Sequence, residues 1–94
     1  MPTLQWTNTA REEYRNILRN VYESSVDKAL DLDEKIEILQ DRLFLFKSLC
    51  PPHPEIPTLR RCVVTQTVAL IYDVDEEIIT VISVVDTRSS HPLN

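Results

Sequence analysis

A proline-rich segment in the middle of the chain separates two halves with different hydrophobic periodicity. Four prolines lie between Cys50 and Pro57. A helix cannot continue through them, because proline lacks the backbone N–H and its ring clashes with the preceding turn. Apolar residues recur every three or four positions before this segment, whereas β-branched residues dominate after it. The pattern predicts an α+β domain with its helices first and its main strands last.

The first half of the chain predicts two helices. Thr9 and Glu12 have the spacing of a capping box, and Asn8 is an alternative cap. The first helix then carries an apolar stripe at helical spacing, made by Ala10, Tyr14, Ile17, Leu18 and Val21. After a turn at residues 24–27, the second helix carries a wider stripe: Leu32, Ile36, Leu39, Leu43 and Phe46, widened by Leu30, Ile38, Leu45 and Leu49. A stripe this wide predicts a helix that lies on a sheet and packs beside another helix.

Strand patterns occupy the start and the second half of the chain. Thr3–Trp6 alternates as a short strand does, and Leu59–Thr65, Val68–Val74 and Ile78–Val85 predict three consecutive strands. Short connections force these three to be antiparallel neighbours. Ile78–Val85 is apolar on both faces, which predicts a central position or cover on both sides. We expect a single domain over residues 1–94: an N-terminal strand, an antiparallel two-helix hairpin and a three-stranded antiparallel sheet, with about four strands in all.

Composition excludes several classes of function. Ten Lys and Arg against fifteen Asp and Glu give a net charge of −5, which argues against broad binding to phosphate backbones. The chain has no glycine, so a glycine-rich nucleotide loop is excluded. No apolar run approaches the roughly 20 residues of a membrane span, and no secretory signal is visible, which predicts a cytoplasmic protein.

Cysteine and histidine usage predicts neither a bridge nor a metal site. A lone disulfide is uncommon in a chain without a secretory signal, so Cys50 and Cys62 are expected to stay reduced. Of the possible zinc ligands, only Cys50 and His53 have recognisable spacing. No metal and no other cofactor is expected.

Four short segments share their order and spacing with a known family. They are Trp6-Thr7-x-x-Ala10, Pro57-Thr58-Leu59-Arg60-Arg61, Ala69-Leu70-Ile71-Tyr72-Asp73-Val74 and the ending from Val84 to Pro92. In this order they resemble the RelE/ParE superfamily of toxins from type II toxin–antitoxin (plasmid stabilisation) modules. The resemblance implies a bacterial growth-inhibiting toxin that a co-encoded antitoxin neutralises.

The superfamily has two branches with different activities, and this chain is more similar to the ParE branch. The RelE branch cleaves messenger RNA on the ribosome, whereas the ParE branch inhibits DNA gyrase without being a nuclease. RNA cleavage needs a base, an acid and cations that stabilise the phosphorane. Here Ala69 replaces an arginine usual in the family, and residues 62–82 contain no Lys, Arg or His. Two alternatives stay open, a ribosome-dependent endoribonuclease and a non-toxic family member that survives as a binding partner, so enzymatic activity is undecided.

The resemblance and the scarcity of cations select the candidate site residues. The proposed target-binding residues are Arg60, Arg61, Arg88 and Tyr72, and the catalytic candidates of the nuclease alternative are Arg61, Arg88, His53 and His91. Each has a structural alternative. Strand alternation sends one of the two adjacent arginines to each face, and one of them is solvated or paired with Glu55. Arg88 bridges Asp86, Tyr72 is a core residue with a satisfied hydroxyl, and the histidines lie in flexible segments flanked by proline. Trp6 is expected to be a core or interface anchor at the sheet edge.

The expected protein partner is the cognate antitoxin. In the family its C-terminal segment wraps the toxin along the helices and sheet, so the groove beside the first helix and the sheet edge are the expected contacts. Because this chain is acidic, the bound segment is expected to be less acidic than usual or to be held by apolar anchors. DNA gyrase and the ribosome are the two candidate targets, and no membrane is involved. A homodimer and a toxin–antitoxin heterotetramer both stay open.

Overall fold

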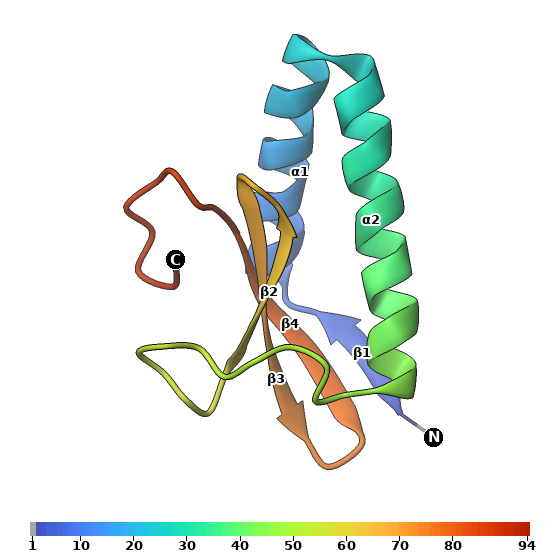
Figure 1. Cartoon of the computed structure of the whole chain (residues 1–94), viewed down its shortest axis with the longest axis vertical. Coiled ribbons are helices and arrows are strands. Elements are labelled where there is room, and N and C mark those ends of the chain that lie inside the picture. Colours follow the sequence, from blue (N-terminus) through green and yellow to red (C-terminus); the bar gives the residue numbers. More distant parts are fainter. Residues whose placement is uncertain (1) are drawn as a thin grey trace.

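The order of elements is that of a helical hairpin inserted between the first strand and the rest of a sheet. The structure is a computed structural model that describes residues 2–94. Its elements are β1 (Thr3–Trp6), α1 (Asn8–Ser24), α2 (Val26–Leu45), β2 (Arg60–Thr65), β3 (Val68–Asp75) and β4 (Ile78–Asp86). Figure 1 shows the two helices side by side along the sheet. The predicted α+β class is confirmed, and the three main strands lie within about one residue of their predicted bounds.

Hydroxyl side chains begin both helices. The Thr7 Oγ1 accepts from the backbone N–H of Ala10 at 3.0 Å and donates to the carbonyl of Ile82 at 3.1 Å, so it caps α1 and attaches it to β4. Capping by Thr9 or Asn8 is therefore wrong. The Ser25 hydroxyl accepts from the Lys28 N–H at 3.2 Å and caps α2. Ser25 alone separates the helices, and the chain reverses there to give the predicted antiparallel pair (Figure 1).

The sheet has four strands and is mixed. The strand order is β1-β4-β3-β2, with β1 parallel to β4 and the other pairs antiparallel. The expectation of a three-stranded antiparallel sheet therefore needs correction, because the N-terminal strand joins the same sheet as a fourth member. No short connection links β1 to β4, so nothing in the chain forces them to be antiparallel. The predicted central position of the last strand is confirmed.

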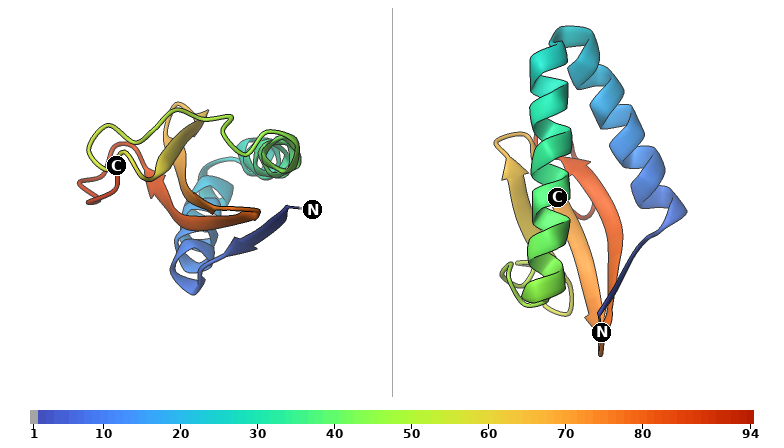
Figure 2. Two further views of the ribbon diagram at one scale, coloured as in Figure 1. Left: turned by 90° about the horizontal axis from the view of Figure 1, so that it is seen from below. Right: turned by 90° about the vertical axis from the view of Figure 1, so that its right-hand side faces the viewer.

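Both faces of the sheet are buried. On one face Leu70, Tyr72 and Val81 pack against the helices, with Leu32 and Ile36 of α2 in the same cluster. Residues that alternate with these and face the other way are buried as well: Ala69, Ile71, Ser83 and Val85. Residues 46–59 (the proline-rich loop) run from the end of α2 alongside β2 towards residues 87–94 (the tail), which lie away from α2, as the left view of Figure 2 shows.

The outer side of α2 differs from the prediction. Leu30, Ile38 and Leu45 were expected to widen the buried stripe, yet they are 66%, 43% and 76% exposed, and Leu49 beyond the helix is exposed too. The helix contacts the sheet and α1 through a narrower face, which carries Ala29, Leu32, Ile36 and Leu43. Neither α1 nor α2 combines the length and the hydropathy of a membrane-spanning helix.

A disulfide fixes the proline-rich loop to β2. Cys50 and Cys62 are bonded, with their Cα atoms 5.3 Å apart, so the expectation of free thiols is wrong. The loop returns alongside the start of β2: the His53 N–H donates to the Leu59 carbonyl and the Arg61 N–H to the Pro51 carbonyl. These two backbone contacts bring the cysteines together. The lack of a secretory signal, from which free thiols were expected, carries no information about this proximity.

Candidate functional site

The adjacent arginines of β2 point to opposite sides of the sheet, as strand alternation predicts. The Arg60 guanidinium donates to the carbonyl of Cys50 at 2.6 Å and lies 3.4 Å from that of Ser48. It therefore holds the start of the proline-rich loop. Among residues 2–94 neither arginine forms an ion pair with Glu55, so that predicted pairing is wrong.

Arg61 lies beside the end of the chain. Its guanidinium donates to the Asn94 Oδ1 at 3.3 Å, and the Asn94 amide in turn donates to the carbonyls of Thr87 and Ser89. The His53 ring nitrogen Nε2 is 2.9 Å from the Leu93 carbonyl. The fold thus brings Arg61, His53 and the tail together, although His53 and Leu93 are 40 positions apart in the sequence.

Arg88 belongs to the tail, but its side chain takes no part in these contacts. Its guanidinium makes a two-bond contact with the Asp86 carboxylate, at 3.0 Å and 2.8 Å, while its side chain stays 73% exposed. These hydrogen bonds lower the pKa of Asp86. The alternative of a surface arginine that bridges Asp86 describes the geometry. The contact leaves the outer side of a planar guanidinium free for a second ligand.

Tyr72 is fully buried in β3. Its hydroxyl donates to the Lys47 carbonyl at 2.9 Å and accepts from the Cys50 N–H at 3.3 Å. Burial raises the pKa of this phenol, against the opposing effects of the Cys50 hydrogen bond and the Arg60 charge. The side chain therefore supports the loop from beneath, as the core alternative describes, and it presents no surface of its own.

His53 is buried and fully occupied by the fold. Its Nδ1 accepts from the backbone N–H groups of Glu55 and Ile56 at 3.1 Å and 3.2 Å, which requires the proton to be on Nε2, facing the Leu93 carbonyl. The expectation of a flexible segment is wrong here, because the ring organises a turn within the prolines. A histidine with both nitrogens engaged is poorly placed to abstract a proton.

His91 belongs to a second hydrogen-bonded group, which connects the tail to α1. Its Nε2 lies 2.6 Å from one oxygen of the Glu13 carboxylate, and the buried Ser83 hydroxyl donates to the other oxygen at 2.7 Å. The Nδ1 of His91 accepts from the Leu93 N–H at 3.0 Å. Serine contacts the carboxylate and not the imidazole, so the arrangement is not that of a serine nucleophile with its histidine base.

The sheet carries no constellation for acid–base chemistry or metal binding. Its face away from α2 is lined by the buried Ala69, Ile71 and Val85, with Ser83 as the polar member. Within the described part of the chain, no three His, Cys, Asp or Glu side chains are arranged to hold a metal ion.

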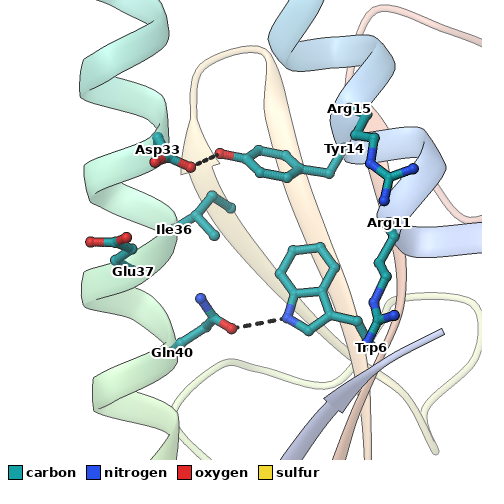
Figure 3. Close-up of a pocket in the computed structure, with 8 residues that line it drawn as sticks. All are labelled: Trp6, Arg11, Tyr14, Arg15, Asp33, Ile36, Glu37 and Gln40. Atoms are coloured by element: carbon teal, nitrogen blue, oxygen red, sulfur yellow. Dashed lines mark hydrogen bonds between the residues drawn. The ribbon is translucent and has the colours of Figure 1, made fainter. Parts of the chain in front are cut away.

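A groove beside the first helix was expected, and one lies between the two helices next to β1, with a more polar lining than the apolar groove that was expected. Its volume is about 310 Å³, and it is lined by Trp6, Arg11, Tyr14, Arg15, Asp33, Ile36, Glu37 and Gln40. Figure 3 shows the two aromatic rings between arginines of α1 and polar side chains of α2. The Tyr14 hydroxyl donates to Asp33 at 2.6 Å and the Trp6 indole N–H to Gln40 at 2.9 Å. The sequence signal for this groove was Trp6 followed by Arg11 and Arg15, which lie one helical turn apart.

The chain matches one family model and several solved structures. The model describes the ParE toxin of the type II toxin–antitoxin system parDE and matches residues 4–91. No curated protein matches the chain in sequence.

The solved structures agree in fold across nearly the whole chain. A structure of the chromosomal ParDE system from Pseudomonas aeruginosa has a TM-score of 0.69 at 17% identity, covering 92% of this chain and 96% of that one. A YoeB/ParE toxin from Agrobacterium tumefaciens has a TM-score of 0.64 at 15% identity, covering 92% and 98%. The YoeB–YefM toxin–antitoxin complex from Staphylococcus aureus has a TM-score of 0.61 at 16% identity, covering 90% and 95%. At these identities the likeness concerns the fold.

Proposed function

We propose, since this chain belongs to the ParE toxin family of type II toxin–antitoxin systems, that it is the toxin of such a module. In this proposal a co-encoded antitoxin neutralises it, and it arrests growth by binding a target, with DNA gyrase the first candidate. It does not cleave RNA. Solved relatives of the same fold include complexes of toxin and antitoxin, which supports a protein partner of that kind.

The observation that carries the binding mode is the use of both histidines by the fold. The His53 ring is buried with both nitrogens bonded, and His91 is bonded to Glu13 and to the Leu93 N–H. Tyr72 gives its hydroxyl to the loop. A nuclease needs a base that can reach the 2′-hydroxyl, and each candidate here is already engaged.

The exposed arginines are the proposed target-binding group. Arg88 is the most accessible of them, and its guanidinium is held by Asp86 in a defined orientation. Arg61 is half-buried beside the tail, and it contributes where the tail and β2 meet. Arg60 and Tyr72 act through the loop that they position.

A ribosome-dependent endoribonuclease is the second candidate, favoured by one contact. The Glu13 carboxylate orients the His91 ring on the partly exposed tail. A carboxylate that holds one nitrogen of an imidazole is a common device for making the other nitrogen a general base, and in this alternative the His91 Nδ1 gives up the Leu93 N–H to take that role. In this alternative Arg61 and Arg88 stabilise the phosphorane.

Messenger-RNA 5′ ends mapped shortly after induction in bacteria separate these functions. We expect growth arrest without new ends, and loss of DNA supercoiling activity when the purified protein is added to gyrase. Arg88→Ala should relieve the arrest, whereas the exposed Arg19→Ala serves as a charge-matched control. New ends in phase with codons, abolished by His91→Ala, establish the nuclease instead. Neither arrest nor new ends indicates a non-toxic family member.

A further inference from the structure

The outer side of α2 carries a regular seam of alternating carboxylates and aliphatic side chains. Six exposed residues form this outer seam: Asp27, Leu30, Glu34, Ile38, Asp41 and Leu45. They follow one another at steps of three and four, the spacing that places side chains on one line along a helix. In the right view of Figure 2, α2 lies in front and no other element covers it.

Charge on α2 makes the seam strongly acidic. The helix carries six carboxylates against three cations, a charge of −3 out of the chain's −5. Outside the seam, Asp33 accepts a hydrogen bond from Tyr14 and Asp31 forms an ion pair with Lys35. Within residues 2–94, none of the seam's three carboxylates forms an ion pair. Three aliphatic side chains between three unpaired carboxylates are complementary to an apolar surface that carries cations at the same spacing.

The geometry of the seam points to a helical occupant. Steps of three and four are those at which one helix packs along another at a shallow angle. From Asp27 to Leu45 the seam runs along about 27 Å of helix, which a partner helix of roughly 18 residues would cover. A charged residue at an alternate seam position selects a partner of opposite charge at the same level.

Charge excludes the other occupants of such a surface. A second copy of α2 would bring three more carboxylates and no seam cation. Anionic lipid and nucleic acid would be repelled in the same way. We propose that the outer seam of α2 docks an amphipathic helix in which aliphatic residues alternate with Lys or Arg at steps of three and four. This rests on the proposed function, because the segment that carries this helix belongs to the antitoxin.

A synthetic peptide tests the chemistry of the seam on the full chain. The probe is a helical peptide of about 21 residues with Leu and Lys alternating at steps of three and four along one face, a length that covers the seam. A second peptide has Glu in place of each Lys. We expect the Lys peptide to bind and the Glu peptide to bind at least about tenfold more weakly, with the difference shrinking at high salt. Equal binding of the two, or binding of neither, overturns the proposal.

Matched variants locate the binding. Leu30→Gln/Ile38→Gln/Leu45→Gln and Glu34→Gln/Asp41→Asn should each weaken the Lys peptide about tenfold or more. The controls are Val63→Gln, an equally exposed aliphatic of β2, and Glu12→Gln/Glu23→Gln, the same charge change on α1. Because all these positions are exposed, the variants should fold, and circular dichroism checks this. Equal losses in the control variants overturn the proposal.

Growth rescue separates this inference from the proposed function. The co-encoded antitoxin of the proposed function, expressed together with the wild-type chain, should restore growth. It should restore much less growth to cells that carry the seam variants. Equal rescue of wild type and seam variants overturns the docking site while the toxin function stands. No arrest by the wild-type chain contradicts the toxin function, and the peptide experiment then decides the seam by itself.

Discussion

Glu76 lies in the left-handed region of backbone conformation, with φ of 54°, at the turn between β3 and β4. A β-carbon makes this region unfavourable by roughly 1–2 kcal/mol, and glycine is the usual occupant. In a chain without glycine the strain is offset from outside: the Lys47 ammonium donates to the Glu76 carbonyl at 3.0 Å and to the Glu77 carboxylate at 3.1 Å. Single residues thus hold a turn that its own sequence disfavours.

Replacing Glu76 by glycine should stabilise the protein. We expect Glu76→Gly to raise the free energy of unfolding by about 0.5–1 kcal/mol, since relief of the left-handed strain exceeds the extra flexibility of the unfolded chain. Urea denaturation measures the change. Glu76→Gln keeps the β-carbon and removes the charge, so it should give a smaller gain. An equal gain in both variants would assign the effect to charge and contradict the backbone explanation.

Removing the Glu13 carboxylate should loosen the tail. Glu13→Ala leaves the buried Ser83 hydroxyl without its acceptor and frees His91, which should cost about 1–3 kcal/mol. Amide exchange should quicken in residues 87–94, as followed by mass spectrometry. Glu12→Ala, at the exposed neighbouring position, is the control and should leave exchange unchanged. Unaltered exchange in the Glu13 variant would show that the other tail contacts suffice.

At the scale of elements, the proline-rich loop depends on one covalent bond. The disulfide spans 12 residues between Cys50 and Cys62. Closing a loop of about this length in the unfolded chain is worth roughly 3 kcal/mol. We expect a dithiol reductant to lower the free energy of unfolding by about that amount, measured in urea with and without reductant. Cys50→Ala/Cys62→Ala should be destabilised and indifferent to reductant. A wild-type chain that is equally stable in both conditions would contradict the bond's role.

The contact between the helices should make the fold sensitive to alkali. The pKa of Tyr14 is raised, first by burial and then by its hydrogen bond to Asp33 and the charges of Asp33 and Glu37. In the unfolded chain the pKa of tyrosine is about 10. Above that pH the unfolded state loses a proton that the folded state keeps, so the free energy of unfolding falls as pH rises. Tyr14→Phe should cost about 1 kcal/mol at neutral pH and flatten this decline.

Urea midpoints across the alkaline range measure this effect. Tyr22→Phe removes a hydroxyl from an exposed ring of α1 and serves as the control. Tyr72, whose pKa burial also raises, keeps its own share of the decline in every variant. The same alkaline slope in Tyr14→Phe and in wild type would refute the assignment.

Local patterns predicted the elements, and contacts between distant segments escaped them. Periodicity placed β2, β3 and β4 within about one residue, because alternation is a local property. The disulfide and the burial of His53 depend on how the loop returns to β2, which no local pattern records. Leu30, Ile38 and Leu45 of α2 were assigned to the core because they recur at helical spacing. That spacing is the same whether the apolar residues face the protein's own sheet or the outside. Of the site candidates, the pairing of Arg88 with Asp86 was foreseen because the two are close in sequence.

At the scale of the whole molecule, the net negative charge affects the rates at which charged partners encounter the protein. A net charge of −5 slows encounter with polyanions and speeds encounter with cationic proteins at low ionic strength. The acidic outer seam and the neutral α1, with three cations and three carboxylates, make this asymmetric over the surface. Inhibition of gyrase, in the proposed function, therefore proceeds through the enzyme's protein surface and not through its DNA.

Binding to DNA should accordingly be absent. We expect no change in the fluorescence anisotropy of a labelled duplex on addition of the protein, even at low salt, where phosphate contacts are strongest. A basic protein of similar size is the positive control. Binding that weakens as salt rises would contradict this expectation and would direct attention to Arg61 and Arg88 as phosphate contacts.

The parallel pairing of β1 with β4 has a consequence for the order of synthesis. Thr3 is aligned with Ile78, so the strand that leaves the ribosome first finds its neighbour only when most of the chain has been made. Contacts this distant along the chain form late and slowly. A translation product that stops before β4 lacks the strand on which both β1 and α1 rest. The sheet can therefore be completed only after β4 has been synthesised.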